Sequence, residues 1–301
     1  MSKLTKNEIK NWFLDLQDQI CKELEKLDGL ASFKEDLWER PEGGGGRSRV
    51  IKAGDLIEKG GVNFSAVHGS TPEKIRSALK LDHADFFASG VSIVLHPENP
   101  WVPIIHMNIR YFEMSNGIWW FGGGIDLTPH IVIKEKAKAF HHTLKKTCDK
   151  HHISYYPEFK KWADDYFFVK HRNETRGVGG IFFDRLTSGE HFTKEQRWEF
   201  VKDVGKTFVP AYTQAAADLR NKKFTHQDKE WQKTRRGRYV EFNLVHDKGT
   251  KFGLDTNGRT ESILMSLPPE ASWEYQREPK NEQEKETLSL LRKDIDWLTI
   301  S

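Results

Sequence analysis

The sequence predicts an α+β protein built on a mostly antiparallel β-sheet, and two observations lead to this prediction. Between residues 91 and 121, apolar side chains recur at every second position, which is the period of strands with two different faces. The turns between these segments are short, and helical spacings occur in separate blocks along the chain. Because short connections favour antiparallel pairing, we expect a sheet of hairpins with helices added in groups, and a single domain over residues 1–301.

A helix is expected first along the chain. Thr5 and Glu8 have the spacing of a capping box, apolar residues follow at helical spacing from Ile9 onward, and Gly29 can end the helix. We interpret residues 1–30 as an amphipathic docking helix.

A low-complexity stretch follows at residues 43–49, where four consecutive glycines precede Arg47 and Arg49. It has two interpretations. One is a flexible surface loop, and the other is a lid whose arginines close over an anion, because glycine frees the backbone and mobile loops gate sites.

The clearest strand covers residues 104–112, where His106, Asn108 and Arg110 share one face with Ile104 and Phe112. A face that also carries apolar residues is expected to be covered, and a covered arginine needs an anionic partner. A solvated sheet face is the alternative. The segment before it, residues 90–96, alternates in the same way, and Asn-Gly at 116–117 predicts a hairpin into residues 118–121. Further strands are expected at 62–67, 180–183, 238–246 and 261–267, and helices at 134–150, 158–169, 193–208 and 281–297.

Composition excludes several classes of protein. The 47 Lys and Arg nearly balance 44 Asp and Glu, giving a net charge of +3, which argues against a dedicated nucleic-acid binder. The basic run at 235–238 is short, and a solvated turn explains it equally well. The two cysteines rule out a disulfide framework and favour a reducing compartment. No apolar run approaches the roughly 18 residues of a membrane span. We therefore expect a cytoplasmic protein without a transmembrane segment.

The familiar catalytic motifs are absent. The chain has no complete dinucleotide fingerprint, P-loop, zinc-protease motif or nucleophile elbow. An enzyme with this sequence would use neither a common redox cofactor nor an acyl-transfer triad. Asp126 follows three glycines that let backbone approach a ligand closely, although it is also placed to cap a helix after Pro129.

Four histidines are candidates for metal ligands, but their spacing matches no compact metal motif. His141 lies on an apolar helical stripe, where a satisfied core histidine is the commoner outcome. The candidates are His96, His106, His141 and His171.

Six long strings of sequence resemble the oxygen-dependent coproporphyrinogen III oxidases of haem biosynthesis. They lie at residues 87–97, 102–112, 119–129, 170–180, 235–243 and 258–268, in the order of that family, and the likeness extends from about residue 43 to 275. The resemblance implies a single domain with a large flat antiparallel sheet flanked on both sides by α-helices. It also implies a homodimer formed through about residues 239–274.

The implied activity is that of an oxidoreductase. Two propionates of coproporphyrinogen III are converted to vinyl groups, giving protoporphyrinogen IX, with O2 as co-substrate and CO2 and H2O2 as products. The resemblance implies no organic cofactor and leaves a divalent metal open, with the four histidines as its candidates. It implies a proton-donor role for His106, a catalytic role for Asp126, and a second active-site acid at Asp247. The implied substrate-binding residues are Ser92, Asn108, Ile109, Arg110, Asn257, Gly258 and Arg259.

Two other functions remain open from the sequence. A tetrapyrrole carrier would keep the cavity without turnover, and a histidine-based metalloenzyme would need the metal. No nucleic-acid partner is expected.

Overall fold

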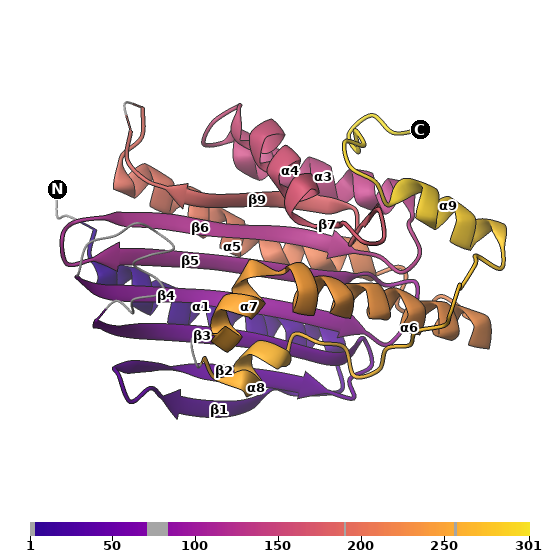
Figure 1. Cartoon of the computed structure of the whole chain (residues 1–301), viewed down its shortest axis with the longest axis horizontal. Coiled ribbons are helices and arrows are strands. Elements are labelled where there is room, and N and C mark those ends of the chain that lie inside the picture. The colour runs from indigo at the N-terminus through magenta and orange to yellow at the C-terminus, as the bar shows by residue number, and fades with distance from the viewer. Residues whose placement is uncertain (1–3, 71–83, 190, 256–257) are drawn as a thin grey trace.

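Seven strands form one antiparallel sheet, in the order β1-β2-β3-β4-β5-β6-β9 (Figure 1). The computed structural model describes residues 4–70, 84–189, 191–255 and 258–301. The strands are β1 (Lys34–Glu39), β2 (Gly44–Lys52), β3 (Ile57–Ser70), β4 (Asp85–Pro97), β5 (Ile104–Met114), β6 (Trp119–Thr128) and β9 (Gly179–Leu186). A separate two-stranded ladder joins β7 (Phe168–Val169) to β8 (Glu174–Thr175).

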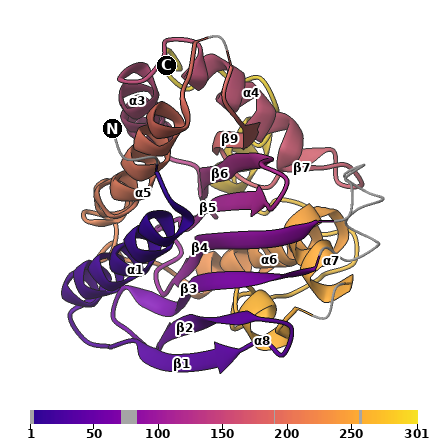
Figure 2. The ribbon, with the colours of Figure 1, turned by 90° about the vertical axis from the view of Figure 1, so that its left-hand side faces the viewer.

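Helices cover both faces of the sheet, as Figure 2 shows from the side. On one face lie α1 (Lys6–Asp28), α3 (Lys134–Asp149) and α5 (Lys194–Ala216), and α4 (Tyr155–Tyr166) packs along β9. On the other face lie α6 (His226–Glu241), its π-helical continuation η1 (Phe242–His246), α7 (Lys248–Asp255) and α8 (Thr260–Leu264), and α9 (Glu282–Leu290) follows near the C-terminus. The predicted α+β class and the antiparallel sheet between helices are confirmed.

The period-two pattern of β5 separates core from site. Ile105, Met107, Ile109 and Tyr111 are fully buried in the core beneath α1 and α5. The intervening His106, Asn108 and Arg110 are only partly buried, on the face that carries α6 and α8. The sequence prediction that these three share a face is therefore confirmed, and the face is only partly covered where full cover was expected.

The first helix begins and ends as its sequence indicates. Thr5 and Glu8 form the capping box, and Gly29 takes the left-handed conformation that ends α1. The apolar stripe of α1 packs against the sheet of the same chain. There the Gln17 side-chain amide donates to the backbone carbonyls of Arg47 and Val62, both at 2.7 Å.

Residues 44–49 form part of a strand instead of the expected loop or lid, and Gly43 lies in the turn before it. Residues 44–52 form β2, paired on both edges with β1 and β3. Arg47 bonds Gln17 and Asp18 of α1, and Arg49 pairs with Glu35 of β1 and with Asp18. The glycines thus serve strand packing, and the arginines fasten α1 to the sheet edge.

Two predicted strands are helical, and one predicted turn is buried. Residues 238–246 end α6 and form η1, because a capping box at Thr225 and Asp228 starts a helix that runs through the alternating segment. Residues 261–267 begin in α8. The basic run at 235–238 belongs to α6, where its arginines pair with Glu174, Glu58 and Glu241.

Among the described residues, no helix is long and apolar enough to cross a membrane.

One buried carboxylate ties α1 to the turn between β2 and β3. Asp28 is 1% exposed, and its oxygens accept backbone N–H groups from Ala31, Leu56 and Ile57 at 3.0, 3.0 and 2.8 Å. Burial opposes its ionisation, but these hydrogen bonds outweigh burial and hold the pKa of Asp28 below its usual value.

We expect Asp28→Ala to lower the free energy of unfolding by about 3 kcal/mol, because several buried N–H groups lose their acceptor. Chemical denaturation measures the loss, with the exposed Asp15→Ala of the same helix as control. Equal stability of the two variants would contradict the role given to Asp28.

Candidate active site

The strand register brings five of the ten predicted catalytic and binding residues onto one face of the sheet. His106 of β5 lies opposite Asp126 of β6, and Asn108 lies opposite Ser92 of β4. Arg110 stands between Gly90 and Gly122, whose lack of side chains leaves the sheet open around it. The centre of the sheet therefore presents a histidine, an amide, a guanidinium and a carboxylate side by side.

Asp126 is the buried centre of this group. Its side chain is 2% exposed, its Oδ1 is 2.7 Å from Nδ1 of His106, and its Oδ2 accepts a hydrogen bond from Nη2 of Arg176 at 2.6 Å. Burial raises the pKa of Asp126, but Arg176 and His106 outweigh burial and bring it below its usual value. Asp126 does not cap the following helix, because the N-cap position of α3 is Ile133.

Arg176 was missed by sequence reasoning as a site residue. It follows β8, and its side chain is 3% exposed. Its guanidinium carbon lies 4.3 Å from the ring centre of Phe167 and 4.7 Å from those of Tyr239 and Phe242. Its Nη1 donates to Asn243 at 3.1 Å. No periodicity marks such a residue, and its presence in one of the family-like strings was the only available signal.

The two predicted arginine anchors lie at different places on the same face. Arg110 donates to Asn108 and to Asp184 of β9, both at 2.8 Å. Arg259 pairs with Asp36 of β1 and donates to Ser262 at 3.0 Å, beside Ser48 of β2. With strands about 4.8 Å apart, β2 and β5 are separated by about 14 Å. The two guanidinium groups therefore contact different parts of the sheet, Arg259 at β1 and β2 and Arg110 at β5 and β9.

The remaining predicted binding residues are placed unevenly. The Ile109 side chain is fully buried on the core face, so only its backbone can contact a ligand on the site face. Gly258 precedes α8 and donates to the Gly253 carbonyl at 2.7 Å. Asn257 lies outside the described residues. Asp247 accepts from Tyr166 at 2.8 Å and from the backbone N–H of Thr250 at 2.7 Å, which caps the start of α7.

The structure does not bring the four candidate metal ligands together. His96 contacts the Ser266 carbonyl, His141 uses both nitrogens on Tyr156 and the Val178 carbonyl, and His171 contacts Glu241 and His246. Burial lowers the pKa of both His96 and His141 to about 3, so both rings are neutral. Within the described ranges, no three His, Cys, Asp or Glu side chains are arranged to hold a metal ion.

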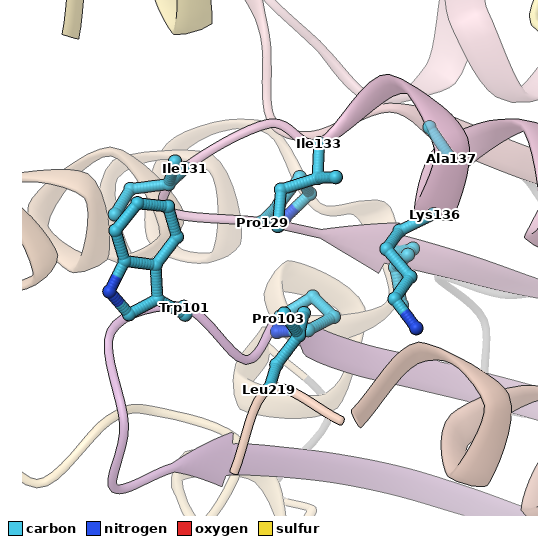
Figure 3. Close-up of a pocket in the computed structure, with 9 residues that line it drawn as sticks. Trp101, Pro103, Pro129, Ile131, Ile133, Lys136, Ala137 and Leu219 are labelled. Carbon is cyan, nitrogen blue, oxygen red and sulfur yellow. The ribbon is translucent and has the colours of Figure 1, made fainter. Parts of the chain in front are cut away.

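A small apolar hollow lies elsewhere in the structure (Figure 3). It is lined by Trp101 and Pro103 before β5, by Leu127 at the end of β6, and by residues at the start of α3. Leu127 faces the core, so this hollow lies on the side of the sheet away from Asp126. It contains none of the predicted site residues.

Comparison with known proteins identifies the family of the chain. The sequence profile described as "Coproporphyrinogen III oxidase" matches residues 8–297. The rat "Oxygen-dependent coproporphyrinogen-III oxidase, mitochondrial" is 48% identical, over 97% of this chain and 69% of its own. The Drosophila melanogaster and Prochlorococcus marinus proteins, both named "Oxygen-dependent coproporphyrinogen-III oxidase", are each 47% identical, over 95% and 96% of this chain and 76% and 90% of their own. The chain therefore belongs to the coproporphyrinogen III oxidase family.

Proposed function

We propose that the face of the sheet around Asp126 is the active site at which this chain converts coproporphyrinogen III into protoporphyrinogen IX in haem biosynthesis, with O2 as co-substrate. The observation that carries this proposal is a buried carboxylate kept ionised by Arg176 and His106, on a face that also holds two separated arginines. Family membership supplies the reaction, and this geometry suggests the roles of the residues.

The substrate performs the redox chemistry in this proposal. An electron-rich porphyrinogen gives electrons to O2 directly, while each reacting propionate leaves as CO2 and becomes a vinyl group. The protein must accept or hold a pyrrole N–H proton, anchor carboxylates and exclude water. No bound flavin, haem or nicotinamide is needed in this scheme, and the four candidate histidines do not gather into one metal site among the described residues.

Asp126 is assigned as the acceptor for the pyrrole nitrogens. Each oxygen of a carboxylate has two acceptor positions, and His106 and Arg176 occupy one on each oxygen. Each oxygen thus retains capacity for a pyrrole N–H. His106 is assigned as proton donor or orienting group, since its Nδ1 is committed to Asp126 and its ring remains 22% exposed.

The periphery of the substrate is assigned to the two arginines. Arg110 and Arg259 would bind propionates, because a guanidinium recognises a carboxylate through paired hydrogen bonds. Ser92 and Asn108 would position the macrocycle, and Asn257 and Gly258 would contact it beside Arg259. Asp247 is assigned as a second acid, supported by its place at the start of α7 on the same side of the sheet.

A homodimer formed through residues 239–274 is also proposed. This segment exposes several large apolar side chains, and such clusters on a soluble surface favour protein contact. They are Leu244, Val245, Phe252, Leu254 and Trp273. A cytoplasmic location is proposed as well, supported by the buried free cysteines Cys21 and Cys148, which fit a reducing compartment.

We expect Asp126→Asn to lower kcat by about 10³-fold while substrate affinity changes little, because the amide cannot act as an anionic proton acceptor. Turnover is followed as CO2 and protoporphyrinogen IX from coproporphyrinogen III in air, with anaerobic samples as the blank. A carrier protein would show no turnover in either form, and that result would refute the proposed activity.

We expect Arg176→Gln to shift the acidic limb of the kcat/KM profile to higher pH. Arg176 lowers the pKa of Asp126, so its removal lets burial raise that pKa, and the carboxylate protonates at a higher pH. The change also leaves Asp126 less compensated, which destabilises the fold by about 3 kcal/mol.

Arg176→Lys, which keeps the charge, should shift the limb less, and Arg292→Gln at an exposed position serves as control. An acidic limb at the same pH in wild type and Arg176→Gln would contradict the pairing.

We expect the double variant Leu244→Glu, Val245→Glu to convert a dimer into a monomer, because two charges would be buried in the contact. Light scattering after size exclusion measures the mass. Leu37→Glu, on the exposed edge strand β1, is the control and should leave the mass unchanged. A dimer that persists in the double variant would exclude this surface.

A further inference from the structure

Arg110 is held in place from two sides. Its Nη1 donates to Oδ1 of Asn108 on its own strand, and its Nη2 donates to Oδ1 of Asp184 on β9, both at 2.8 Å. Between β5 and β9 runs β6, so the guanidinium lies across a whole strand to reach Asp184. An unrestrained arginine populates many rotamers, and two fixed acceptors remove much of that freedom before a ligand binds.

Gly122 makes this arrangement possible. It lies opposite Arg110 in the β5–β6 register, directly under the path of the guanidinium. A Cβ at position 122 would be 2.9 Å from both Cζ and Nη2 of Arg110 and 2.5 Å from Oδ1 of Asp184. Both distances are below ordinary contact, so a side chain here would displace the arginine or its partner. The Arg110–Asp184 ion pair therefore occupies the space that a side chain at position 122 would need.

The hydrogen bonds of Arg110 indicate whether Asp184 orients the guanidinium or competes with a substrate carboxylate for it. If Asp184 occupied the place of a substrate carboxylate, we would expect both of its oxygens to accept hydrogen bonds from two neighbouring N–H groups of the guanidinium. Asp184 instead uses one oxygen on one nitrogen, and Asn108 takes one hydrogen of the other. Three of the five N–H donors of Arg110 remain for a ligand. The Arg110 side chain is 37% exposed and that of Asp184 is 32% exposed, so these donors are accessible.

We propose that Asp184 is a positioning residue that holds the Arg110 guanidinium flat across Gly122, so that its remaining N–H groups meet a propionate of the substrate. This inference rests on the proposed function. It assigns to β9 a part in substrate recognition that the site residues described above do not include.

The test compares Asp184→Ala and Asp184→Asn with wild type. Three quantities are measured: KM and kcat for coproporphyrinogen III, and the Kd of coproporphyrin III, the oxidised form of the substrate, which does not react. For Asp184→Ala we expect KM and Kd to rise about fivefold with little change in kcat, the scale of a partly exposed ion pair. Asp184→Asn keeps an oxygen acceptor, so its KM and Kd should lie between those of wild type and Asp184→Ala. A loss of folded protein alone would lower kcat and leave KM unchanged, so the split separates positioning from structure.

Gly122→Ala gives an independent test, because it leaves both charged residues in the chain. We expect it to raise Kd in the same way as Asp184→Ala. The control Asp165→Ala removes an exposed aspartate paired with Lys293 and should not raise Kd. Unchanged binding by Asp184→Ala would overturn the proposal, because it would mean that Asp184 has no part in binding. Tighter binding would also overturn it, because it would mean that Asp184 competes with the ligand for Arg110. If wild type bound coproporphyrin III without turning over the substrate, the proposed activity would fail, and the Kd comparison would still decide the role of Asp184.

Discussion

The buried ion pair between Asp126 and Arg176 is the interaction on which the site depends. Taking both charges out of water is costly, and their mutual attraction together with further hydrogen bonds offsets that cost. Here His106 bonds the other oxygen of the carboxylate, while Asn243 and three aromatic rings surround the guanidinium, whose Nε has no hydrogen-bond partner among the described residues. The pair therefore joins β6, the segment after β8 and the end of α6 into one unit. Arg176, which helps to keep Asp126 ionised, also links the sheet to the helical layer through Asn243, Tyr239 and Phe242.

Strand alternation is the second constraint. In β5 each side chain belongs either to the core beneath α1 and α5 or to the site beneath α6 and α8. A shift of the register by one residue would exchange the two sets, placing Arg110 in the core and Ile109 in the site. The fully buried row on one face thus fixes the positions of His106, Asn108 and Arg110 on the other. Core packing sets the precision of the site.

Much of this arrangement could be predicted from the sequence where the signal is local. The faces of β5 follow from alternation, and α1 follows from its capping box. Asp184 and Arg176 could not be predicted from pattern, because their roles depend on which strands and loops meet in space. Residues 238–246 alternate like a strand but continue a helix that starts at Thr225, so a distant cap decided their structure. The glycines at 43–46 predict a flexible loop or a lid because the restraint on this segment comes from pairing with β1 and β3, which no local pattern shows.

The connectivity of the sheet has a consequence for how the protein acquires its site during synthesis. From β1 to β6 each strand pairs with its neighbour in sequence, so this part can form as successive local hairpins with little chain-closure entropy. Arg176, Asp184 and Asn243 come from later in the chain and reach the sheet last. A nascent chain that has finished β6 would hold Asp126 beside His106 but without the Arg176 guanidinium. The site is therefore completed late in synthesis, when the C-terminal half of the chain packs on the sheet.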